Sequence, residues 1–474
     1  MEPWRNLFYH AMNMFNLIIA SYFFLGNGVY TILMLVSLGW VWLHNRRLIY
    51  RGLDSLRESV VTPPVSIIMP AYNEQDIIVE SVQSVLQTDY PSMYVIVVDD
   101  GSSDETLARL INAFRLVKMD LIYRPILPTQ PLRGFYLNPR IPNLLVISKR
   151  NGGKPDALNV GINMVRTPYF CTLDADCILE RDALLRLMVP VVQTPINTAV
   201  SGGIVRILNG CQLKEGQVMK VALPPTRLER FQVVEYLRSF LLGRTGWDAM
   251  AGTMIVSGAM AVFHRETVVE AGGFGQDTVT EDMDLIVQLH RWAVAHKRRI
   301  KMTFTSDPVC WTECPSNLQM LARQRRRWQL GLCQTLWKNS DMLFKRAYGV
   351  VGMLSFPFQL YLEALGSGVE FLGYFMIPLA LMFGMVPPKL WLLFVALALA
   401  YGSFLSVGAV LLEELTYRRY PTFRDLTTLL LFAFLENIGY RQLVLFYRFQ
   451  GLVRFLTGFR TWEKVAHVGA RSKA

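Results

Sequence analysis

Two aspartates stand one residue apart at the end of an apolar run, in the segment YFCTLDADC. If this run is a β-strand, Asp174 and Asp176 point to the same side, because side chains alternate along a strand. Carboxylates placed in this way can hold one divalent cation between the protein and the phosphate oxygens of a ligand. An Asp-x-Asp pair alone also fits a solvated turn, so the neighbouring segments must decide between the two interpretations.

The segment NGGKPDALN at residues 151–159 precedes this aspartate pair. Its glycines allow a ligand to approach the backbone closely, Lys154 supplies a positive charge, and a helix is expected to begin directly after them. Each of these features favours binding of a phosphate group. Together with the aspartates, the segment predicts a site for a nucleotide diphosphate with Mg²⁺ or Mn²⁺.

The elements that must position these residues are strands and helices in alternation. Residues 65–69 and 94–98 are short β-branched runs, and each is followed by a polar turn and a helical pattern. This order predicts a mostly parallel sheet, in which ligands bind beyond the carboxyl ends of the strands. The polar residues at these strand ends are Tyr72, Asn73, Glu74, Asp99, Asp100 and Ser102. A helix cap explains Ser102, whereas two adjacent carboxylates require a partner rich in hydrogen-bond donors.

A third candidate segment, LARQRRRWQL at residues 321–330, holds three consecutive arginines beside a tryptophan. Lipid phosphates, nucleic acid and a departing diphosphate are the anions that such a segment can face. The chain has no helix-turn-helix, zinc-finger or RNA-binding signature, so we expect no nucleic-acid partner. Adjacent positions on a helix differ by about 100°, so one arginine can face a donor pocket while the others meet lipid phosphates or acidic side chains.

Composition indicates a soluble domain joined to a membrane part. The 474 residues are 52% hydrophobic and 18% charged, and the net charge is +11. This is too apolar for an ordinary soluble protein, and a basic excess beside membrane spans is typical of cytoplasmic flanks that meet anionic lipid. Six scattered cysteines indicate reduced thiols, and the pair Cys310 and Cys314 has no nearby histidine to complete a metal site.

Apolar segments at both ends of the chain predict the membrane part. Residues 15–43 contain no charge and are followed by Arg46 and Arg47, so the chain after them is expected to be cytoplasmic. Residues 366–386 and 389–412 predict a hairpin of two spans. The run after Thr427 carries polar residues that are costly in lipid, so it either packs inside the bundle or, as we prefer, forms an interfacial or re-entrant segment. Those residues are Glu436, Asn437, Arg441 and Gln442.

Six motifs now follow one another in an order that resembles a known family. They are PAYNE at 70–74, DDGSSD at 99–104, GGKPDALN at 152–159, DAD at 174–176, TED at 280–282 and QRRRW at 324–328. This order resembles the membrane-bound, inverting family 2 glycosyltransferases, which include cellulose, chitin, hyaluronan and poly-N-acetylglucosamine synthases. The resemblance covers about residues 63–340. It implies an α/β GT-A-like (Rossmann-like) cytoplasmic domain with flanking transmembrane and interfacial α-helices, located at a bacterial inner membrane.

The resemblance also implies a role for individual residues. The donor UDP-sugar would be held by Pro70, Ala71, Tyr72, Glu74, Asp100, Lys154, Asp174 and Arg327. Asp174 and Asp176 would hold the metal, and Asp282 would be the general base. The acceptor would be bound by Ser257, Gly258, Glu281, Gln324 and Trp328. The domains would be residues 1–47 (transmembrane helix), 48–345 (glycosyltransferase), 346–450 (transmembrane and interface helices) and 451–474 (basic tail).

The chemistry of sugar transfer agrees with this assignment. Transfer from a nucleotide sugar requires that the charge developing on the diphosphate is neutralised and that the acceptor hydroxyl loses its proton. A divalent ion and a guanidinium can serve the first need, and the planar donor fork of Arg327 suits a diphosphate better than a lysine would. A single carboxylate serves the second, and direct attack by the acceptor inverts the anomeric centre.

Three functions remain open at this point. The first is extension of a polysaccharide with export through the membrane, for which the resemblance suggests UDP-N-acetylglucosamine as donor. The second is addition of one sugar to a lipid-linked acceptor, against which the Gln-x-x-Arg-Trp motif and three or more spans argue. The third is an inactive binding protein, against which the complete set of carboxylates argues. A small C-terminal bundle suggests a homo-oligomer or an export partner, and the proline-rich insert at 119–148 has no evident role.

Overall fold

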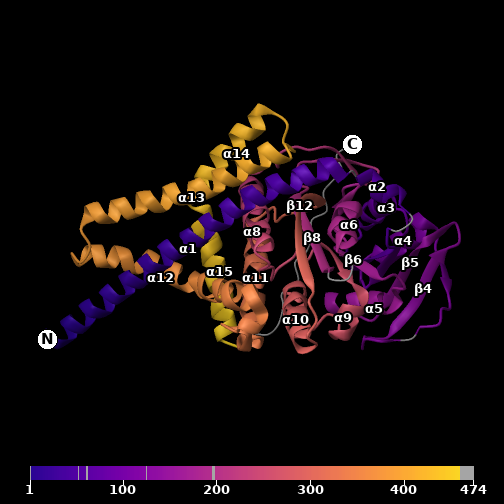
Figure 1. Ribbon diagram of the computed structural model, residues 1–474, viewed down its shortest axis with the longest axis horizontal. Helices are drawn as coiled ribbons and strands as arrows, with labels where there is room; N and C mark the ends of the chain where they lie inside the picture. Colours follow the sequence, from indigo (N-terminus) through magenta and orange to yellow (C-terminus); the bar gives the residue numbers. More distant parts are fainter. Residues whose placement is uncertain (1, 52, 60–61, 124, 195–197, 459–474) are drawn as a thin grey trace. The chain divides into compact units, whose positions relative to one another are not determined.

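The structure is a computed structural model that describes residues 2–458 except 52, 60–61, 124 and 195–197 (Figure 1). The chain divides into two compact units. We call residues 41–229 and 250–314 the α/β unit, and residues 2–40, 230–249 and 315–458 the helical unit. Helices α1 (Glu2–Arg51) and α7 (Arg227–Tyr236) each extend across a boundary between the units. Residues 459–474 of the expected basic tail lie outside the described residues.

A ten-stranded sheet forms the centre of the α/β unit, in the order β3-β4-β5-β2-β1-β6-β11-β8-β12-β7. Strands β5, β2, β1 and β6 are parallel neighbours, β8 and β12 are also parallel, and β11 is antiparallel to both β6 and β8. The strands are β1 Val65–Ala71, β2 Met93–Asp99, β3 Val117–Met119, β4 Leu132–Asn138, β5 Ile141–Lys149, β6 Tyr169–Leu173, β7 Ile178–Leu179, β8 Thr198–Ile207, β11 Met260–His264 and β12 Lys301–Thr312. A separate hairpin pairs β9 (Gln212–Lys214) with β10 (Gln217–Lys220). The predicted α/β fold is confirmed, but the sheet is mixed: of its nine neighbouring strand pairs in the described residues, four are parallel and five antiparallel. The parallel pairs include the strands β5, β2, β1 and β6 that carry the predicted ligand site.

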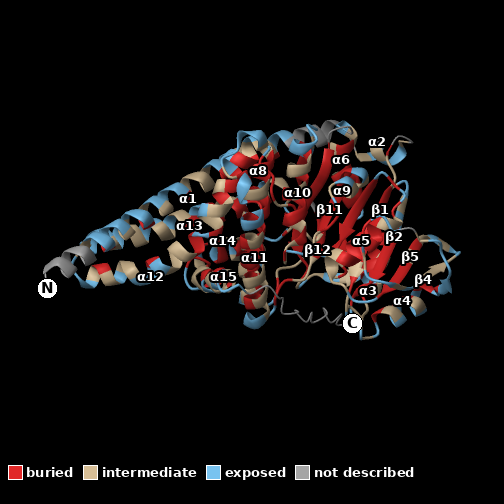
Figure 2. Cartoon of the chain, turned by 90° about the horizontal axis from the view of Figure 1, so that it is seen from below, coloured by how far each residue is buried: buried red, intermediate tan, exposed pale blue. Residues whose placement is uncertain are grey.

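Helices cover the sheet and bury its strands. They are α2 Leu53–Glu58, α3 Ile78–Leu86, α4 Thr106–Phe114, α5 Lys154–Met164, α6 Ala183–Gln193, α9 Arg265–Glu270 and α10 Glu281–Ala295. The central strands are coloured as buried in Figure 2, as expected for a sheet covered on both faces. The main core joins Ile68 of β1, Phe170 of β6 and Leu158 of α5, all of which are fully or almost fully buried.

The proline-rich insert between β3 and β5 extends the sheet and is tied to α5. Its second half forms β4, which pairs antiparallel with β5. The backbone N–H groups of Ile126 and Leu127 donate to Asn163 Oδ1 over 3.0 and 2.8 Å, and Leu127 is buried in the main core. The backbone N–H of Gln130 donates to the carboxylate of Asp156 over 3.1 Å. The insert therefore braces the helix that begins at Lys154.

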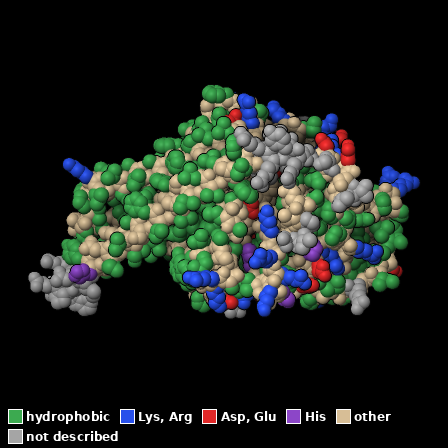
Figure 3. Space-filling model, in the orientation of Figure 1, with side chains coloured by type: hydrophobic (Ala, Val, Ile, Leu, Met, Phe, Trp, Pro, Cys, Tyr) green, Lys and Arg blue, Asp and Glu red, His purple; other side chains and the backbone are tan. Residues whose placement is uncertain are grey.

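Long apolar helices dominate the helical unit. Its remaining elements are η1 Leu237–Arg244, α8 Thr245–Ala249, α11 Leu318–Lys338, η2 Ser340–Met342, η3 Arg346–Tyr348, η4 Val351–Ser355, η5 Phe358–Ala364, α12 Gly366–Met382, α13 Pro388–Thr416, α14 Phe423–Leu435 and α15 Tyr440–Leu456. Three stretches, Tyr9–Leu43, Val351–Met382 and Pro388–Thr416, are long and apolar enough to cross a membrane. Hydrophobic side chains cover most of the visible surface of α1, α12 and α13 in Figure 3. The second stretch begins earlier than the expected residue 366, because the π-helical turns η4 and η5 continue into α12.

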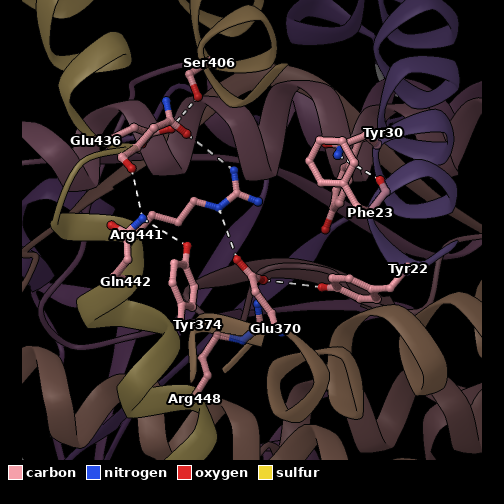
Figure 4. A network of polar contacts seen from close by, with 12 residues as sticks. Tyr22, Phe23, Tyr30, Glu370, Tyr374, Ser406, Glu436, Arg441, Gln442 and Arg448 are labelled. Atoms are coloured by element: carbon pink, nitrogen blue, oxygen red, sulfur yellow. Dashed lines mark hydrogen bonds and ion pairs between the residues drawn. The ribbon is translucent and has the colours of Figure 1, made fainter. Parts of the chain in front are cut away.

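The run after Thr427 forms α14 and α15, which meet at an angle of 57°. The pair is therefore either one broken span or a re-entrant loop, and three spans become four if it crosses. Its costly polar residues are enclosed by protein: Glu436 is 1% and Asn437 4% exposed. Ser406 of α13 donates a hydrogen bond to Glu436, as Figure 4 shows. Both alternatives that the sequence leaves open thus remain, but these two side chains pack inside the helical unit.

Charged residues of α12 and α15 pair within the helical unit. The Arg441 guanidinium lies 4.0 Å from Glu370, which also accepts a hydrogen bond from the Tyr22 hydroxyl of α1 over 3.4 Å (Figure 4). The Arg448 guanidinium forms an ion pair of 2.8 Å with Glu363. Such charges are costly in lipid unless they are paired, so these contacts make it possible for α15 to lie among apolar helices.

Replacing Gly161 by alanine tests the packing of α5 on β1. A Cβ atom at this position would lie within 3.0 Å of the Ile68 side chain, which is fully buried. We expect Gly161→Ala to lower the free energy of unfolding by about 1–3 kcal/mol, the usual cost of overpacking a core. Thermal unfolding of the protein in detergent measures the change. Gly39→Ala in α1, where a Cβ atom meets open space, is the control and should cause no loss.

Candidate active site

A buried lysine organises the strand ends where the sequence predicts a ligand. Lys149, the last residue of β5, is fully buried and forms ion pairs with Asp100 and, over 2.7 Å, with Asp156. The backbone N–H groups of Gly152 and Gly153 donate to the two carboxylate oxygens of Asp100 over 2.9 and 2.8 Å. Burial raises the pKa of Asp100 and these donors oppose the rise. They are the donor-rich partner that two adjacent aspartates require.

The contacts with Asp100 also position the glycine loop and the first residue of α5. Gly153 has a φ of +88°, a backbone conformation that residues other than glycine rarely adopt. It directly precedes Lys154, the first residue of the helix. Asp99 is satisfied separately, because it accepts from the backbone N–H of Ser102 over 3.1 Å and from the Ser148 hydroxyl over 3.0 Å. The chain after β5 is therefore held in place by the carboxylates at the end of β2.

The loops after β1 and β2 hold each other through side-chain caps. Asn73 is left-handed, with φ of 58°; its backbone N–H donates to the Ser102 hydroxyl over 3.0 Å. The Glu74 backbone N–H donates to the Thr106 hydroxyl over 2.8 Å. The backbone N–H of Asp100 donates to the Ala71 carbonyl over 2.9 Å. Ala71, Glu74 and Asp100, which are predicted to bind the UDP-sugar, therefore lie together. Pro70 and Tyr72, predicted to bind the same ligand, are partly buried on the same chain segment.

Lys154 joins the predicted metal and acceptor residues. Its ammonium lies 2.7 Å from Asp174 and 2.9 Å from Glu281 and donates to the Gly258 carbonyl over 3.4 Å. Burial alone would lower the pKa of Lys154, but the two carboxylates outweigh it and hold that pKa above its ordinary value. The backbone N–H of Asp174 donates to the Ala259 carbonyl over 3.0 Å. One side chain thus draws together the end of β6, the start of α10 and the segment that carries Ser257 and Gly258.

The predicted base Asp282 lies against Gly258. A Cβ atom on Gly258 would stand 2.7 Å from Asp282 Oδ2, so only a glycine leaves that carboxylate its present position. Asp282 Oδ1 accepts from the backbone N–H of Met283 over 2.9 Å in the first turn of α10. Helix N-termini favour a negative charge. Glu281, in contrast, is 8% exposed and turned to Lys154, so its predicted contact with an acceptor stays a prediction.

Negative charge accumulates around Asp176. The Asp176 carboxylate accepts from the Thr312 hydroxyl over 3.2 Å. Burial, followed by the charges of Asp176 and Asp174, raises the pKa of Glu74 from its ordinary 4.5 to about 9. Burial also raises the pKa of Asp174 to about 6, although Lys154 opposes the shift. This region therefore has a deficit of positive charge that a cationic ligand would relieve.

A divalent cation fits this region if the donor supplies part of its coordination. Among the residues that the structure describes, no three His, Cys, Asp or Glu side chains form a ligand set for a metal ion. Mg²⁺ is commonly bound by one or two carboxylates together with substrate phosphates. Asp174 and Asp176 would be those carboxylates, and the raised pKa of Glu74 is the observation that favours added positive charge.

The helical unit contains the remaining predicted residues, all on α11. Gln324 and Arg327 are partly buried and Trp328 is 38% exposed. Arg325 is 3% exposed and pairs with Glu235 over 2.8 Å, so it faces an acidic side chain and not lipid. Arg326, with Arg323 and Tyr447, lines a cleft of about 350 Å³, and contact of Arg326 with lipid phosphate stays a prediction.

Two residues that organise the site, Lys149 and Asp156, are not predicted by the sequence patterns. Lys149 ends an apolar strand, and a charged residue in that position is the signal that could have indicated a buried ion pair. Asp156 belongs to the quoted glycine-loop motif, yet its partners Lys149 and Gln130 are not evident from spacing. Both residues position the loop, and neither has a predicted contact with substrate.

Comparison with known proteins defines the class. Residues 139–331 match the family described as glycosyltransferase like family 2, and residues 66–124 match glycosyl transferase family 2. These two matches cover all six motifs, and they agree with the resemblance to the family 2 glycosyltransferases.

Over part of its length the chain resembles poly-beta-1,6-N-acetyl-D-glucosamine synthases. The Staphylococcus aureus protein is 26% identical over 284 residues, which are 60% of this chain and 58% of the relative. The Staphylococcus epidermidis protein is 25% identical over 267 residues, or 56% of this chain and 54% of the relative. The matched region thus spans little more than half the length of these relatives.

Solved structures show a more distant likeness. A mannosyltransferase from Pyrobaculum calidifontis, in complex with GDP-Man and Mn²⁺, aligns with 88% of this chain and 99% of its own, at 19% identity and a TM-score of 0.44. TarS from S. aureus, residues 1–349 in complex with UDP-GlcNAc, aligns with 80% of this chain and 92% of its own, at 14% identity and a TM-score of 0.37.

The charge deficit predicts a pH-dependent effect of Glu74→Gln. A carboxyl group whose pKa is raised in the folded protein lowers stability once the pH exceeds its unfolded pKa, and the loss grows until the folded pKa is passed. The amide cannot ionise. The melting temperature of Glu74→Gln should therefore rise relative to the unmodified protein as the pH increases from 5 to 9.

Thermal unfolding in detergent at pH 5, 7 and 9 measures this effect. Glu80→Gln is the control, because Glu80 is exposed on α3. A difference between Glu74→Gln and the unmodified protein that does not change with pH would show that Glu74 is ionised throughout.

Proposed function

We propose that this protein is an inverting, metal-dependent glycosyltransferase that moves a sugar from a UDP-sugar to a growing polysaccharide at a membrane. The observation that carries the proposal is the Lys154 cluster. In it, one ammonium holds Asp174 and Glu281 and also contacts the carbonyl of Gly258, against which Asp282 lies. A donor-binding carboxylate and a candidate base therefore belong to one continuous site at the strand ends. The matches to the two family 2 glycosyltransferase models and the order of the motifs support the same function.

The residues of the site divide the reaction between them. The Asp282 carboxylate accepts the proton of the acceptor hydroxyl, whose oxygen attacks the anomeric carbon of the sugar. The new carbon–oxygen bond forms as the bond from that carbon to the diphosphate oxygen breaks, and UDP leaves with the electron pair. Lys154 lies where it can donate to a phosphate oxygen, and the loop at Gly152 and Gly153 leaves the backbone accessible. A divalent cation held by Asp174 and Asp176 would neutralise the charge that develops on the diphosphate.

The resemblance to the family gives further roles to residues of α11, which belongs to the helical unit. Arg327 would offer a planar pair of donors to the leaving diphosphate. Trp328 offers a partly exposed aromatic face to an acceptor sugar. Pro70, Ala71, Tyr72, Glu74 and Asp100 would bind the uridine end of the donor, and Ser257 and Gln324 would line the acceptor site.

The membrane arrangement is part of the proposal. The α/β unit would be cytoplasmic, because Arg46 and Arg47 follow the first apolar stretch; their side chains lie outside the described part of the chain. The apolar helices would anchor the protein in the bilayer, so that the polysaccharide product can enter the membrane. UDP-N-acetylglucosamine is the proposed donor because the chain resembles the poly-beta-1,6-N-acetyl-D-glucosamine synthases. Transfer of one sugar to a lipid-linked acceptor stays the alternative, although the Gln-x-x-Arg-Trp motif and the three apolar stretches of the described chain argue against it.

The test is a transfer assay with the full chain purified in detergent. Labelled UDP-N-acetylglucosamine, UDP-glucose and UDP-glucuronic acid are supplied separately with Mg²⁺ or Mn²⁺, and the product is sized at low conversion. Long product beside unused acceptor supports polymer extension, whereas a single addition to lipid supports the alternative. Absence of transfer from every UDP-sugar would contradict the proposed function.

Asp282→Asn should separate binding from turnover. The amide has nearly the size of the carboxylate but cannot take a proton, so loss of the general base should slow transfer by roughly a hundredfold or more. UDP binding, measured by calorimetry, should stay nearly unchanged because the base faces the acceptor. Transfer close to normal would place the base elsewhere, and Glu281 would be the next residue to replace.

Gly258→Ala should disturb the same carboxylate without changing its chemistry. The added Cβ atom would stand 2.7 Å from Asp282 Oδ2, so the carboxylate must move while the backbone remains. We expect kcat to fall by roughly tenfold or more, because misplacement by about an ångström can cost up to a hundredfold. The melting temperature should change little. A normal kcat would mean that Asp282 reacts from a position other than the one described.

A further inference from the structure

The aromatic residue proposed to bind the acceptor has a guanidinium over its ring. The Arg325 guanidinium carbon lies 4.4 Å from the centroid of a Trp328 ring. Arg325 is 3% exposed, whereas Trp328 is 38% exposed. A cation against an aromatic face restricts the orientation of that ring. The buried arginine therefore supports a side chain that still presents part of its surface.

A carboxylate from another helix holds this arginine. Glu235 of α7 pairs with Arg325 through its Oε2 atom over 2.8 Å. The same Oε2 atom accepts a hydrogen bond from the Tyr440 hydroxyl of α15 over 2.6 Å. The ring of Tyr440 in turn stacks on Phe231 of α7, with centroids 4.9 Å apart. Residues from three helices therefore fix one carboxylate, and all of them belong to the helical unit.

The energetics make Glu235 the critical member of this group. Arg325 is buried, and a buried charge is strongly unfavourable unless a partner compensates it. Its Nε atom is buried with no hydrogen-bond partner among the described residues, so the ion pair with Glu235 is its principal polar contact. Without Glu235 the guanidinium would turn towards water and leave the ring of Trp328.

We propose that Glu235 is a positioning residue for the acceptor: through Arg325 it holds Trp328 in the orientation that receives a sugar ring. This proposal rests on the proposed function and adds a determinant of acceptor binding far from the reacting carboxylates in sequence. Glu235 itself touches neither donor nor acceptor in this role.

The test compares acceptor and donor kinetics in purified full-length protein. An N-acetylglucosamine pentasaccharide serves as acceptor and UDP-N-acetylglucosamine as donor. Glu235→Gln should raise the KM for the pentasaccharide roughly threefold to thirtyfold, the factor that corresponds to the range of a cation–π contact. The KM for the donor should be unchanged. Tyr440→Phe, which removes only the hydroxyl, should give a smaller increase in the same direction.

A double variant guards against loss of folding. Replacing a buried ion pair by uncharged side chains is often neutral for stability, so Glu235→Gln with Arg325→Met should fold yet show the raised acceptor KM. Glu436→Gln is the matched control: Glu436 is also buried and paired, with Arg238. It should leave the acceptor KM unchanged.

The outcomes separate the two proposals. If the unmodified protein transfers no sugar to the pentasaccharide or to any other acceptor, the proposed function fails, whatever the variants do. If it transfers sugar and the double variant keeps a normal acceptor KM, the role of Glu235 is overturned. The same conclusion follows if both KM values rise together or if Glu436→Gln matches Glu235→Gln, because either result indicates a general effect on the helical unit.

Discussion

Negative charge concentrated at one edge of the sheet is the constraint on which the rest of the site depends. Asp100, Asp156, Asp174 and Glu281 come from different elements and would repel one another in an apolar surrounding. Lys149 and Lys154 resolve this repulsion in two ways. Lys149 is fully buried and its ion pairs position the glycine loop, so its role is structural. Lys154 is about one-third exposed and bridges residues that a ligand would use, so its contacts can be exchanged.

The helical unit meets a related constraint with different means. Its charged residues lie among apolar helices, where an unpaired charge would be strongly unfavourable. Arg448, Arg441 and Arg325 each pair with a glutamate from another helix, and these pairs determine which helices pack together. The polar contacts in Figure 4 therefore specify helix neighbours that apolar packing alone would leave ambiguous. The paired charged residues, which are uncommon in helices that contact lipid, thus help to fix how the helices of this unit pack.

Local sequence patterns were sufficient for β1, β2 and β6, the glycine loop and the long apolar helices, because each depends on neighbouring residues. The strand expected to carry Asp174 and Asp176 ends at Leu173, however, and the two aspartates lie in the turn that follows it. The motif order also predicted the family. Contacts between distant segments were beyond this reasoning: nothing in the spacing of Arg325 predicted its pairing with Glu235, 90 positions away, in place of lipid. The strand β11 inserts antiparallel between β6 and β8, and no periodicity indicates such an order. Roles of individual site residues rest on chemistry and resemblance, since geometry alone does not assign them.

The insert between β3 and β5 has a consequence for how this protein can vary. Connections at the edge of a sheet usually accept insertions and deletions freely. Here the same connection contributes a core residue, Leu127, and donates backbone hydrogen bonds to both Asn163 and Asp156 of α5. A change in its length would shift the start of that helix and the glycine loop before it. Sequence length at this edge should therefore be restricted among functional relatives, and this connection is a poor place for an epitope tag.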